Sequence, residues 1–182
     1  EPRVVNGRLV PGSRTVRYEN RVAGSARGVE MMLQRLDANS FSGWISYSYG
    51  RNRYHDTVSQ ETYWGDLDQR HTFNLYGTYR LSPRTSVSGK LRMGSNFPAQ
   101  GYYDESDGRY YVGETKNDVR LPSFARLDLR VNRTFMWSTR RLTLFVEVIN
   151  VLNRENVRYH PPSIDARTFE ARRLFESLLP VV

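Results

Sequence analysis

The residues that most often carry chemistry are few in this sequence and do not form a catalytic or metal-binding pattern. The three histidines are His55, His71 and His160, and no two stand at the spacing that would let them share a metal ion. Cysteine is absent and no Gly-x-Ser-x-Gly segment occurs, which excludes thiolate zinc sites, cysteine nucleophiles and that serine motif. Nearby carboxylates could gather a cation, but the glycine-turn pattern of a calcium loop is missing; they are Asp56, Glu61, Asp66 and Asp68. We therefore expect no catalytic residue, no metal and no cofactor.

Aromatic residues gather instead in two polar stretches that interrupt the rest of the sequence. Such groups can grip a chelate, a sugar or a peptide by stacking and hydrogen bonding. In the second stretch they alternate with Asp104, Glu105, Asp107 and Arg109. An alternative interpretation is that they stiffen a loop or extend an aromatic belt. The candidate solute-contacting residues are Tyr63, Trp64, Tyr102, Tyr103, Tyr110 and Tyr111.

The basic residues are almost all arginine, and they are distributed evenly. Only Lys90 and Lys116 are lysines among 27 basic residues, and the net charge is +8. Arginine forks match phosphate oxygens, so nucleic acid or anionic lipid is the usual partner of such a chain. Nucleic-acid binders, however, concentrate their charge on one stripe or tail, whereas acidic residues interleave here. We expect no nucleic-acid partner.

Apolar and polar residues alternate with period two along most of the chain, which predicts strands rather than helices. Trp44 and Tyr76 are exceptions, because each falls among the polar positions of its strand. No run of about 18 apolar residues occurs, which excludes a transmembrane helix. Residues 3–23 are expected to add one or two strands. The main strands are predicted over residues 26–36, 41–49, 71–81, 86–93, 126–135 and 142–148.

The connections between these strands alternate in length. Tight turns are predicted at 36–40, 82–85 and 137–140, and long polar loops near 56–68, 98–122 and 154–179. Short turns at one end and long loops at the other are typical of an antiparallel up-and-down transmembrane β-barrel. Strands of about 9–11 residues also suit a membrane crossing better than a globular domain, where about 5–6 is usual. A soluble or surface β-sandwich that binds carbohydrate through its Tyr-rich loops is the alternative, and a barrel-wall enzyme using His71 near Asp68 is a weaker one.

Charge decides which face of the strands meets lipid. Turning over the strand at 126–132 would place Arg126 and Arg130 in hydrocarbon, at about 2–4 kcal/mol each near the midplane. Leu127, Leu129 and Val131 must therefore face outward. The polar face then lines a wet interior, with its arginines paired to acids. The predicted lumen-lining residues are Arg80, Arg92, Arg126, Asp128, Arg130 and Glu147.

Aromatic residues next to the tight turns suggest a membrane-interface belt. Phe135 and Trp137 lie two residues apart, on one side of a strand, just before a turn, and Phe41 opens a strand after another turn. Aromatic girdles of transmembrane barrels lie at this level. Ordinary aromatics that cap a sandwich core would show the same spacing.

Five short segments resemble the C-terminal part of the barrel domain of TonB-dependent outer-membrane receptors. In order, they are Gly28-Val29-Glu30 with Gly43-Trp44-Ile45-Ser46-Tyr47-Ser48-Tyr49; Asp68-Gln69-Arg70-His71 with Thr72-Phe73-Asn74-Leu75; Gly94-Ser95-Asn96-Phe97-Pro98; Leu121-Pro122-Ser123-Phe124 with Arg126-Leu127-Asp128-Leu129-Arg130; and Asn150-Val151-Leu152-Asn153. Each segment is a weak signal, but five in family order and spacing are a strong one.

The resemblance implies a fragment of a plugged barrel, which in this family has roughly 22 strands. Residues 1–25 would hold partial barrel strands and 26–182 the C-terminal strands, while the plug domain and the final strand would lie outside the sequence. It also implies the Gram-negative outer membrane as location and energy-coupled uptake of a large, scarce solute: a ferric siderophore, a vitamin or a glycan. The implied partners are outer-membrane lipid, the receptor's own plug, the TonB energy-coupling complex reached through that plug, and the extracellular solute.

Overall fold

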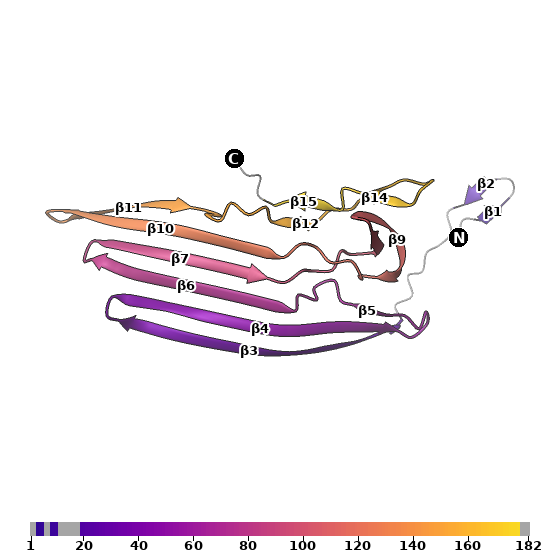
Figure 1. Ribbon diagram of the computed structural model, residues 1–182, viewed down its shortest axis with the longest axis horizontal. Coiled ribbons are helices and arrows are strands. Elements are labelled where there is room, and N and C mark those ends of the chain that lie inside the picture. Colours follow the sequence, from indigo (N-terminus) through magenta and orange to yellow (C-terminus); the bar gives the residue numbers. More distant parts are fainter. Residues whose placement is uncertain (1–2, 6–7, 11–18, 179–182) are drawn as a thin grey trace.

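The computed structural model describes residues 3–5, 8–10 and 19–178, and every regular element in them is a β-strand. Six long strands form one antiparallel sheet in the order β11-β10-β7-β6-β4-β3, with β5 (Thr62–Trp64) paired to β4 (Figure 1). The sheet is an open segment of an up-and-down transmembrane barrel, as the sequence predicts. Its long strands are β3 (Val22–Ala38), β4 (Phe41–Asp56), β6 (His71–Ser82), β7 (Thr85–Gly94), β10 (Phe124–Trp137) and β11 (Arg140–Val148).

The three predicted tight turns join neighbouring strands at one end of this sheet. Asn39 and Ser40 both have positive φ, at 53° and 65°, so the β3–β4 connection is a two-residue turn whose twist matches the strands it joins. Strand β3 thus continues to Ala38, through most of the segment predicted as a turn at 36–40. At the other end, the predicted loops contain short strands of their own, which alternation alone did not reveal.

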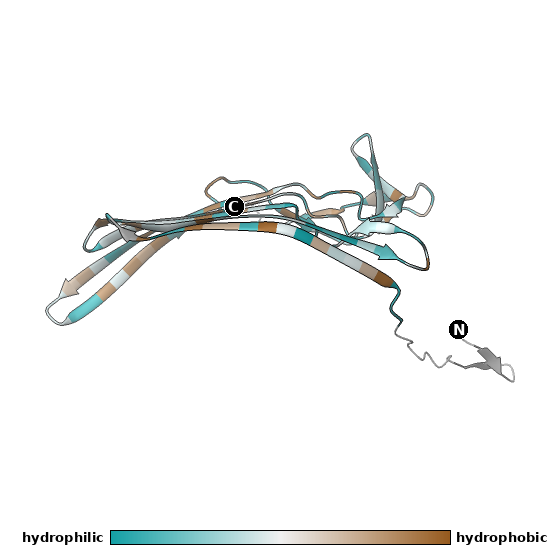
Figure 2. Ribbon diagram, turned by 90° about the horizontal axis from the view of Figure 1, so that it is seen from below, coloured by the Kyte–Doolittle hydropathy of each residue, from teal (hydrophilic) through white to brown (hydrophobic). Residues whose placement is uncertain are grey.

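Register places branched aliphatic residues of five strands side by side at one depth of the sheet. Leu33 pairs with Ile45, Ile45 with Leu75, Leu75 with Leu91, and Leu91 with Leu127. We call these five residues the aliphatic row. Since successive side chains point to opposite faces, the neighbouring positions form a polar row on the other face: Gln34, Trp44, Tyr76, Lys90 and Asp128. Figure 2 shows hydrophobic and hydrophilic residues interleaved along these strands.

The two residues that break the alternation meet each other. Trp44 and Tyr76 are cross-strand partners in β4 and β6, and their rings stack with centroids 6.4 Å apart and planes 30° apart. Both therefore face inward, toward the polar side of the wall. Two exceptions that look independent in the sequence form one aromatic pair in the structure.

The aliphatic face is uncovered, which contradicts the β-sandwich alternative. Leu33 is 72% exposed and Val146 is 70% exposed, and none of the residues that the structure describes forms a second layer over them. No helix in the described ranges is long and apolar enough to cross a membrane. Near the turns, Phe135 and Trp137 stack at 5.8 Å on the aliphatic face.

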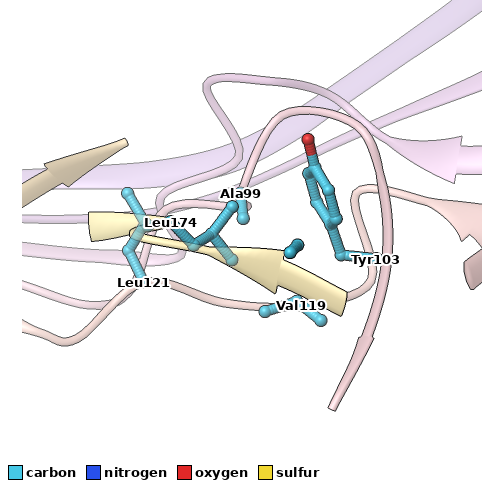
Figure 3. Packing of buried hydrophobic residues seen from close by; sticks show 6 residues of the cluster. Ala99, Tyr103, Val119, Leu121 and Leu174 are labelled. Atoms are coloured by element: carbon cyan, nitrogen blue, oxygen red, sulfur yellow. The ribbon is translucent and has the colours of Figure 1, made fainter. Parts of the chain in front are cut away.

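At the other end of the sheet, the loops fold into a small layer with its own core, which we call the loop cap (57–70, 95–123 and 149–178). Its strands pair in the orders β13-β14-β9-β8 and β12-β15. The buried apolar cluster is Ala99, Tyr103, Val119, Leu121, Ala171 and Leu174 (Figure 3). The cap strands are β8 (Tyr102–Ser106), β9 (Arg109–Lys116), β12 (Val157–Tyr159), β13 (Ser163–Ile164), β14 (Glu170–Arg172) and β15 (Phe175–Ser177).

A buried asparagine joins this cap to the wall. The Oδ1 atom of Asn156 accepts a hydrogen bond from the Ala125 amide (3.0 Å), and its Nδ2 donates to the Ala125 carbonyl (3.1 Å). The side-chain amide thus satisfies the backbone of β10 beyond the end of its partner strand β11, as a neighbouring strand would.

The N-terminal strands are separate from the barrel sheet. β1 (Arg3–Val5) pairs with β2 (Arg8–Val10), and the main sheet begins at Val22. The described part of 1–25 therefore contains a small hairpin and the start of β3. The division of the chain at residue 25 stays a prediction.

Candidate functional site

Along one edge, β4 pairs first with β5 and then with β6, and the candidate site lies at the gap between these two partners. β4 pairs with β5 up to Arg53 opposite Trp64, and with β6 from Tyr49 opposite His71. Gly65 and Arg70 still make backbone hydrogen bonds to β4, and residues 66–69 between them leave the ladder. The Asp68 carboxylate fills the gap, because its Oδ1 accepts a hydrogen bond from the Asn52 amide at 2.7 Å.

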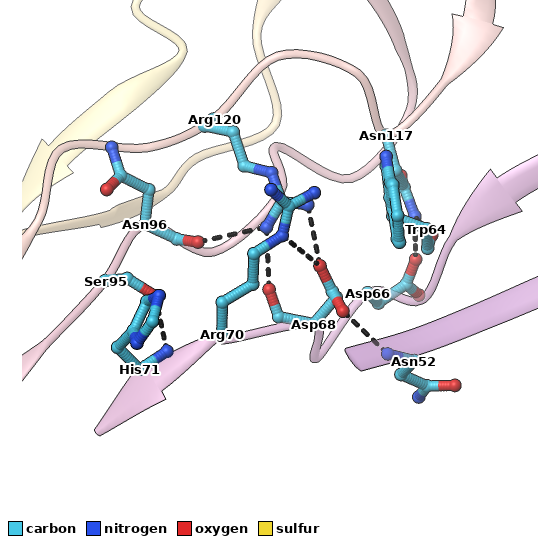
Figure 4. A network of polar contacts seen from close by, with 10 residues as sticks. All are labelled: Asn52, Trp64, Asp66, Asp68, Arg70, His71, Ser95, Asn96, Asn117 and Arg120. Atoms are coloured by element: carbon cyan, nitrogen blue, oxygen red, sulfur yellow. Dashed lines mark hydrogen bonds and ion pairs between the residues drawn. The ribbon is translucent and has the colours of Figure 1, made fainter. Parts of the chain in front are cut away.

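Arg120, which lies in the loop at 95–123, binds Asp68 in this gap. Its Nη2 donates to Asp68 Oδ2 at 2.6 Å and its Nη1 to the Asp68 carbonyl at 2.7 Å (Figure 4). Arg70 lies 3.6 Å from the same carboxylate. Burial opposes ionisation of Asp68, but the bonds from Asn52 and Arg120 outweigh it, so the pKa of this carboxyl lies below its ordinary value. The buried acid is therefore a charged anchor.

Asn117, also buried, joins the same two loops. Its Nδ2 donates to the Trp64 carbonyl and to Asp66 Oδ1, both at 2.7 Å, while its Oδ1 accepts from the Gly101 amide at 3.0 Å. Together with Arg120, it fixes the loop at 95–123 against the loop at 57–70. The polar contacts thus hold the mouth of the barrel wall in one arrangement.

The aromatic candidates do not form one cluster. Tyr103 is buried in the cap core with its hydroxyl 3.3 Å from that of Tyr159, and burial raises its pKa. Tyr110 packs edge-on against Phe175 at 5.2 Å. Tyr111 is half-buried and lies opposite Glu170 in the cap sheet. For Tyr103 and Tyr110, these contacts favour the alternative interpretation, in which the rings stiffen the loops.

The other three aromatic candidates lie nearer the wall. The hydroxyl of Tyr102 donates to Glu61 at 3.0 Å, and this bond raises the pKa of the phenol. Tyr63 carries the Lys116 ammonium 4.5 Å from its ring centre. Trp64 is surrounded by guanidinium groups, the nearest being that of Arg70 at 4.6 Å.

An apolar-lined pocket of about 550 Å³ opens where the cap meets the inner face of the wall. Arg92 and Arg126 reach it from the wall, with Arg92 5.8 Å from the ring centre of Phe124. Sequence reasoning predicted that the two arginines line the lumen but missed the apolar lining, because segments far apart in the sequence supply it. Those apolar residues are Leu67, Phe97, Pro98, Leu121, Pro122, Phe124, Val157, Tyr159 and Leu178.

Below this pocket, the inner face carries the predicted arginine–acid pairs. Arg126 Nε lies 2.7 Å from Asp128, and Arg130 lies 3.8 Å from Glu147. Arg130 also sits 3.8 Å above the ring centre of Phe145. These groups line an open cavity of about 490 Å³, while Arg80 lies on the same face opposite Ser86.

The structure does not assemble the groups that the enzyme alternative requires. His71 Nδ1 lies 2.9 Å from the Tyr47 hydroxyl, whereas Asp68 binds Asn52 and Arg120. No hydrogen bond or ion pair joins His71 to Asp68 in the part of the chain that the structure describes. The two carboxylate oxygens of Glu61 accept hydrogen bonds from the Tyr102 hydroxyl and from the Lys116 amide.

Comparison with known protein families identifies the family of this chain. Residues 3–151 match the family model described as TonB dependent receptor-like, beta-barrel. No curated protein and no solved structure matches the chain.

Proposed function

The chain belongs to the TonB-dependent receptor-like β-barrel family, and from that premise we propose that it forms part of the wall and the outer mouth of an outer-membrane transporter. Its cargo is a large, scarce solute of the siderophore, vitamin or glycan kind. The transporter is coupled to its own plug and, through the plug, to the TonB energy-coupling complex. Residues 26–182 supply C-terminal strands of this barrel and the loops that join them.

The observation that carries this proposal is the pocket between cap and wall. An apolar lining favours the body of an organic solute, and the guanidinium groups of Arg92 and Arg126 favour anionic or polar oxygens on it. Since Arg126 already binds Asp128, Arg92 is the more available cation. The pocket opens onto the polar inner face, so a bound solute has a wet path inward.

Other candidate residues receive roles around this pocket. Tyr102 and Tyr63 contribute the upper rim, because they lie on the loop side of the wall, while Trp64 packs against Arg51 and Arg53 of β4. Tyr103, Tyr110 and Tyr111 hold the cap in shape. The paired groups Arg126–Asp128 and Arg130–Glu147, with Arg80, contact the plug and the passing solute.

The test uses the complete receptor that contains this chain, with ferric siderophores, corrinoid vitamins and oligosaccharides as the solute panel. We expect one class to bind, and the variant R92Q/F124A to bind it at least tenfold more weakly. R109Q and L152A alter exposed residues that do not line the pocket, and they should bind like the wild type.

The outcomes separate the pocket from the transport function. Unchanged binding in a folded R92Q/F124A receptor would contradict the pocket assignment. Uptake that persists after the inner-membrane proton gradient is collapsed would contradict energy-coupled transport.

A further inference from the structure

A cluster of arginines lies on the lipid-facing side of the wall, at its loop end. Strand alternation puts Arg51 and Arg53 of β4 on the same face as Tyr49, the face that carries the aliphatic row. Arg27 of β3 pairs directly with Arg51, so it shares that face. Trp64 pairs with Arg53 and covers this region. We call Arg27, Arg51 and Arg53 the outer arginine cluster.

The depth of this cluster follows from the two aromatic levels of β4. Phe41 and Tyr49 are eight residue steps apart, which is about 27 Å along a strand at ~3.4 Å per residue. A tilt of about 40° reduces this to roughly 20 Å of membrane depth, close to the apolar band of an outer-membrane barrel. Arg51 and Arg53 lie two and four steps beyond Tyr49. They therefore sit at the level of lipid headgroups, just outside the hydrocarbon.

The cluster has an excess of positive charge. The guanidinium groups of Arg51 and Arg53 both lie 5.3 Å from the ring centre of Trp64, and Arg70 and Arg120 approach the same ring at 4.6 and 5.8 Å. Asp68 neutralises part of this charge through Arg120 and Arg70. Within the described residues, no carboxylate lies within 4 Å of the three arginines of the outer cluster.

The unbalanced positive charge of the outer arginine cluster favours the binding of an anion. Like charges directly opposite each other on a sheet, as in Arg27 and Arg51, are destabilising. Arg70, which lies beside the cluster, has its Nε 3.6 Å from Asp68, so the charge of that carboxylate is directed to Arg70 and Arg120 rather than to the three cluster arginines. Trp64 offers a flat face against which guanidinium groups stack, and this leaves their N–H edges free to bind oxygens.

We propose that the outer arginine cluster binds the phosphate of a lipid headgroup in the outer leaflet of the membrane. The arginine forks hold the phosphate oxygens, while the acyl chains lie along the neighbouring outward residues Val29, Met31 and Tyr49. A solute entering the mouth does not reach these groups, because they face away from the interior. The inference therefore goes beyond the proposed transport.

The experiment uses the complete receptor in detergent, with diphosphorylated lipid A as the probe and native mass spectrometry as the readout. We expect saturable binding to the wild type and at least tenfold weaker binding to R51Q/R53Q. R109Q/R167Q removes the same charge from exposed loop positions and should bind like the wild type. Enzymatically dephosphorylated lipid A should bind at least tenfold more weakly.

Three results would overturn the inference: unchanged binding in folded R51Q/R53Q, equal binding of the dephosphorylated lipid, or competition by micromolar inorganic phosphate, which would identify a site for a free anion. Heat-modifiable migration on gels reports folding of each variant. Should R51Q/R53Q fail to fold, R27Q provides the same test, with at least threefold weaker binding expected and wild-type binding contradicting the site.

Discussion

The barrel wall and the loop cap bury their apolar side chains against different surroundings. In the wall, the aliphatic row faces outward and is left open by the protein itself, as Leu33 shows. In the cap, Ala99 and Leu174 are almost completely enclosed by neighbouring loops. The wall is thus completed by lipid, whereas the cap forms an ordinary protein core.

Polar groups follow the reverse pattern in the two regions. The wall exposes its charges to the water-filled interior, where Arg130 and Glu147 sit in a partly exposed pair. The cap buries Asp68 and Asn117; Asp68 accepts hydrogen bonds from Asn52 of β4 and from Arg120, and Asn117 donates one to the Trp64 carbonyl. Substitutions in the wall should therefore affect membrane assembly, and those in the cap should affect local order at the mouth.

The sharpest test of this contrast compares adjacent residues of β4. Ile45→Arg places a charge in the aliphatic row, and we expect it to lower the free energy of unfolding from the membrane by about 2–4 kcal/mol. Ser46→Arg places the same charge on the inner face and should have little effect. Urea unfolding of the complete receptor in lipid bilayers measures both. Equal losses in the two variants would mean that the faces are assigned wrongly.

A cavity in the cap core tests whether the cap is an independent unit. Leu174→Ala removes a buried side chain and should destabilise the cap by about 2–3 kcal/mol, because a cavity remains. Amide hydrogen exchange should speed up in the cap peptides and stay unchanged in β6 and β7. Leu152→Ala, at an exposed position, is the control. Faster exchange throughout the wall would show that the two regions unfold together.

Removing the charge of Asp68, the buried residue that anchors the loops, should lower the stability of the cap slightly less. Asp68→Asn keeps an acceptor for the Asn52 amide but removes the charge that Arg120 binds, and we expect a loss of about 2 kcal/mol in cap stability. Limited proteolysis of the loop at 95–123 measures this loss. Asp107→Asn changes an exposed acid at a hairpin tip and should leave cleavage unchanged. Equal cleavage of the two variants would contradict the anchoring role.

Acid should loosen the cap before the wall, and this is the smallest expected effect. Because the folded-state pKa of Asp68 lies below its ordinary value of 3.8, its contribution is complete above about pH 5 and is lost as the pH falls below 4. Hydrogen exchange of the cap, corrected for the intrinsic pH dependence, measures the loss. Asp68→Asn should show a weaker acid response, and an unchanged response would assign the effect to other carboxylates.

Strand positions and faces were predictable from the sequence, while the mouth was predictable only in part. Alternation located β4, β6, β7, β10 and β11 because each face depends on local spacing. The segment from Asp68 to His71 was recognisable as a motif, yet its partner Arg120 lies 52 residues further along the chain. The apolar lining of the pocket was missed for the same reason. Tyr103 and Tyr110 gave no sequence signal that would separate a core residue from a ligand contact.

By itself, the sequence determined which side of each strand meets lipid. The reason is local and energetic: side chains alternate with period two, and an arginine near the middle of the hydrocarbon costs about 2–4 kcal/mol. Only the tertiary structure decided which loops meet at the mouth, and that Trp44 stacks on Tyr76 and Asn156 bonds to Ala125. Such contacts depend on the path of the backbone between distant segments, which no spacing along the chain encodes.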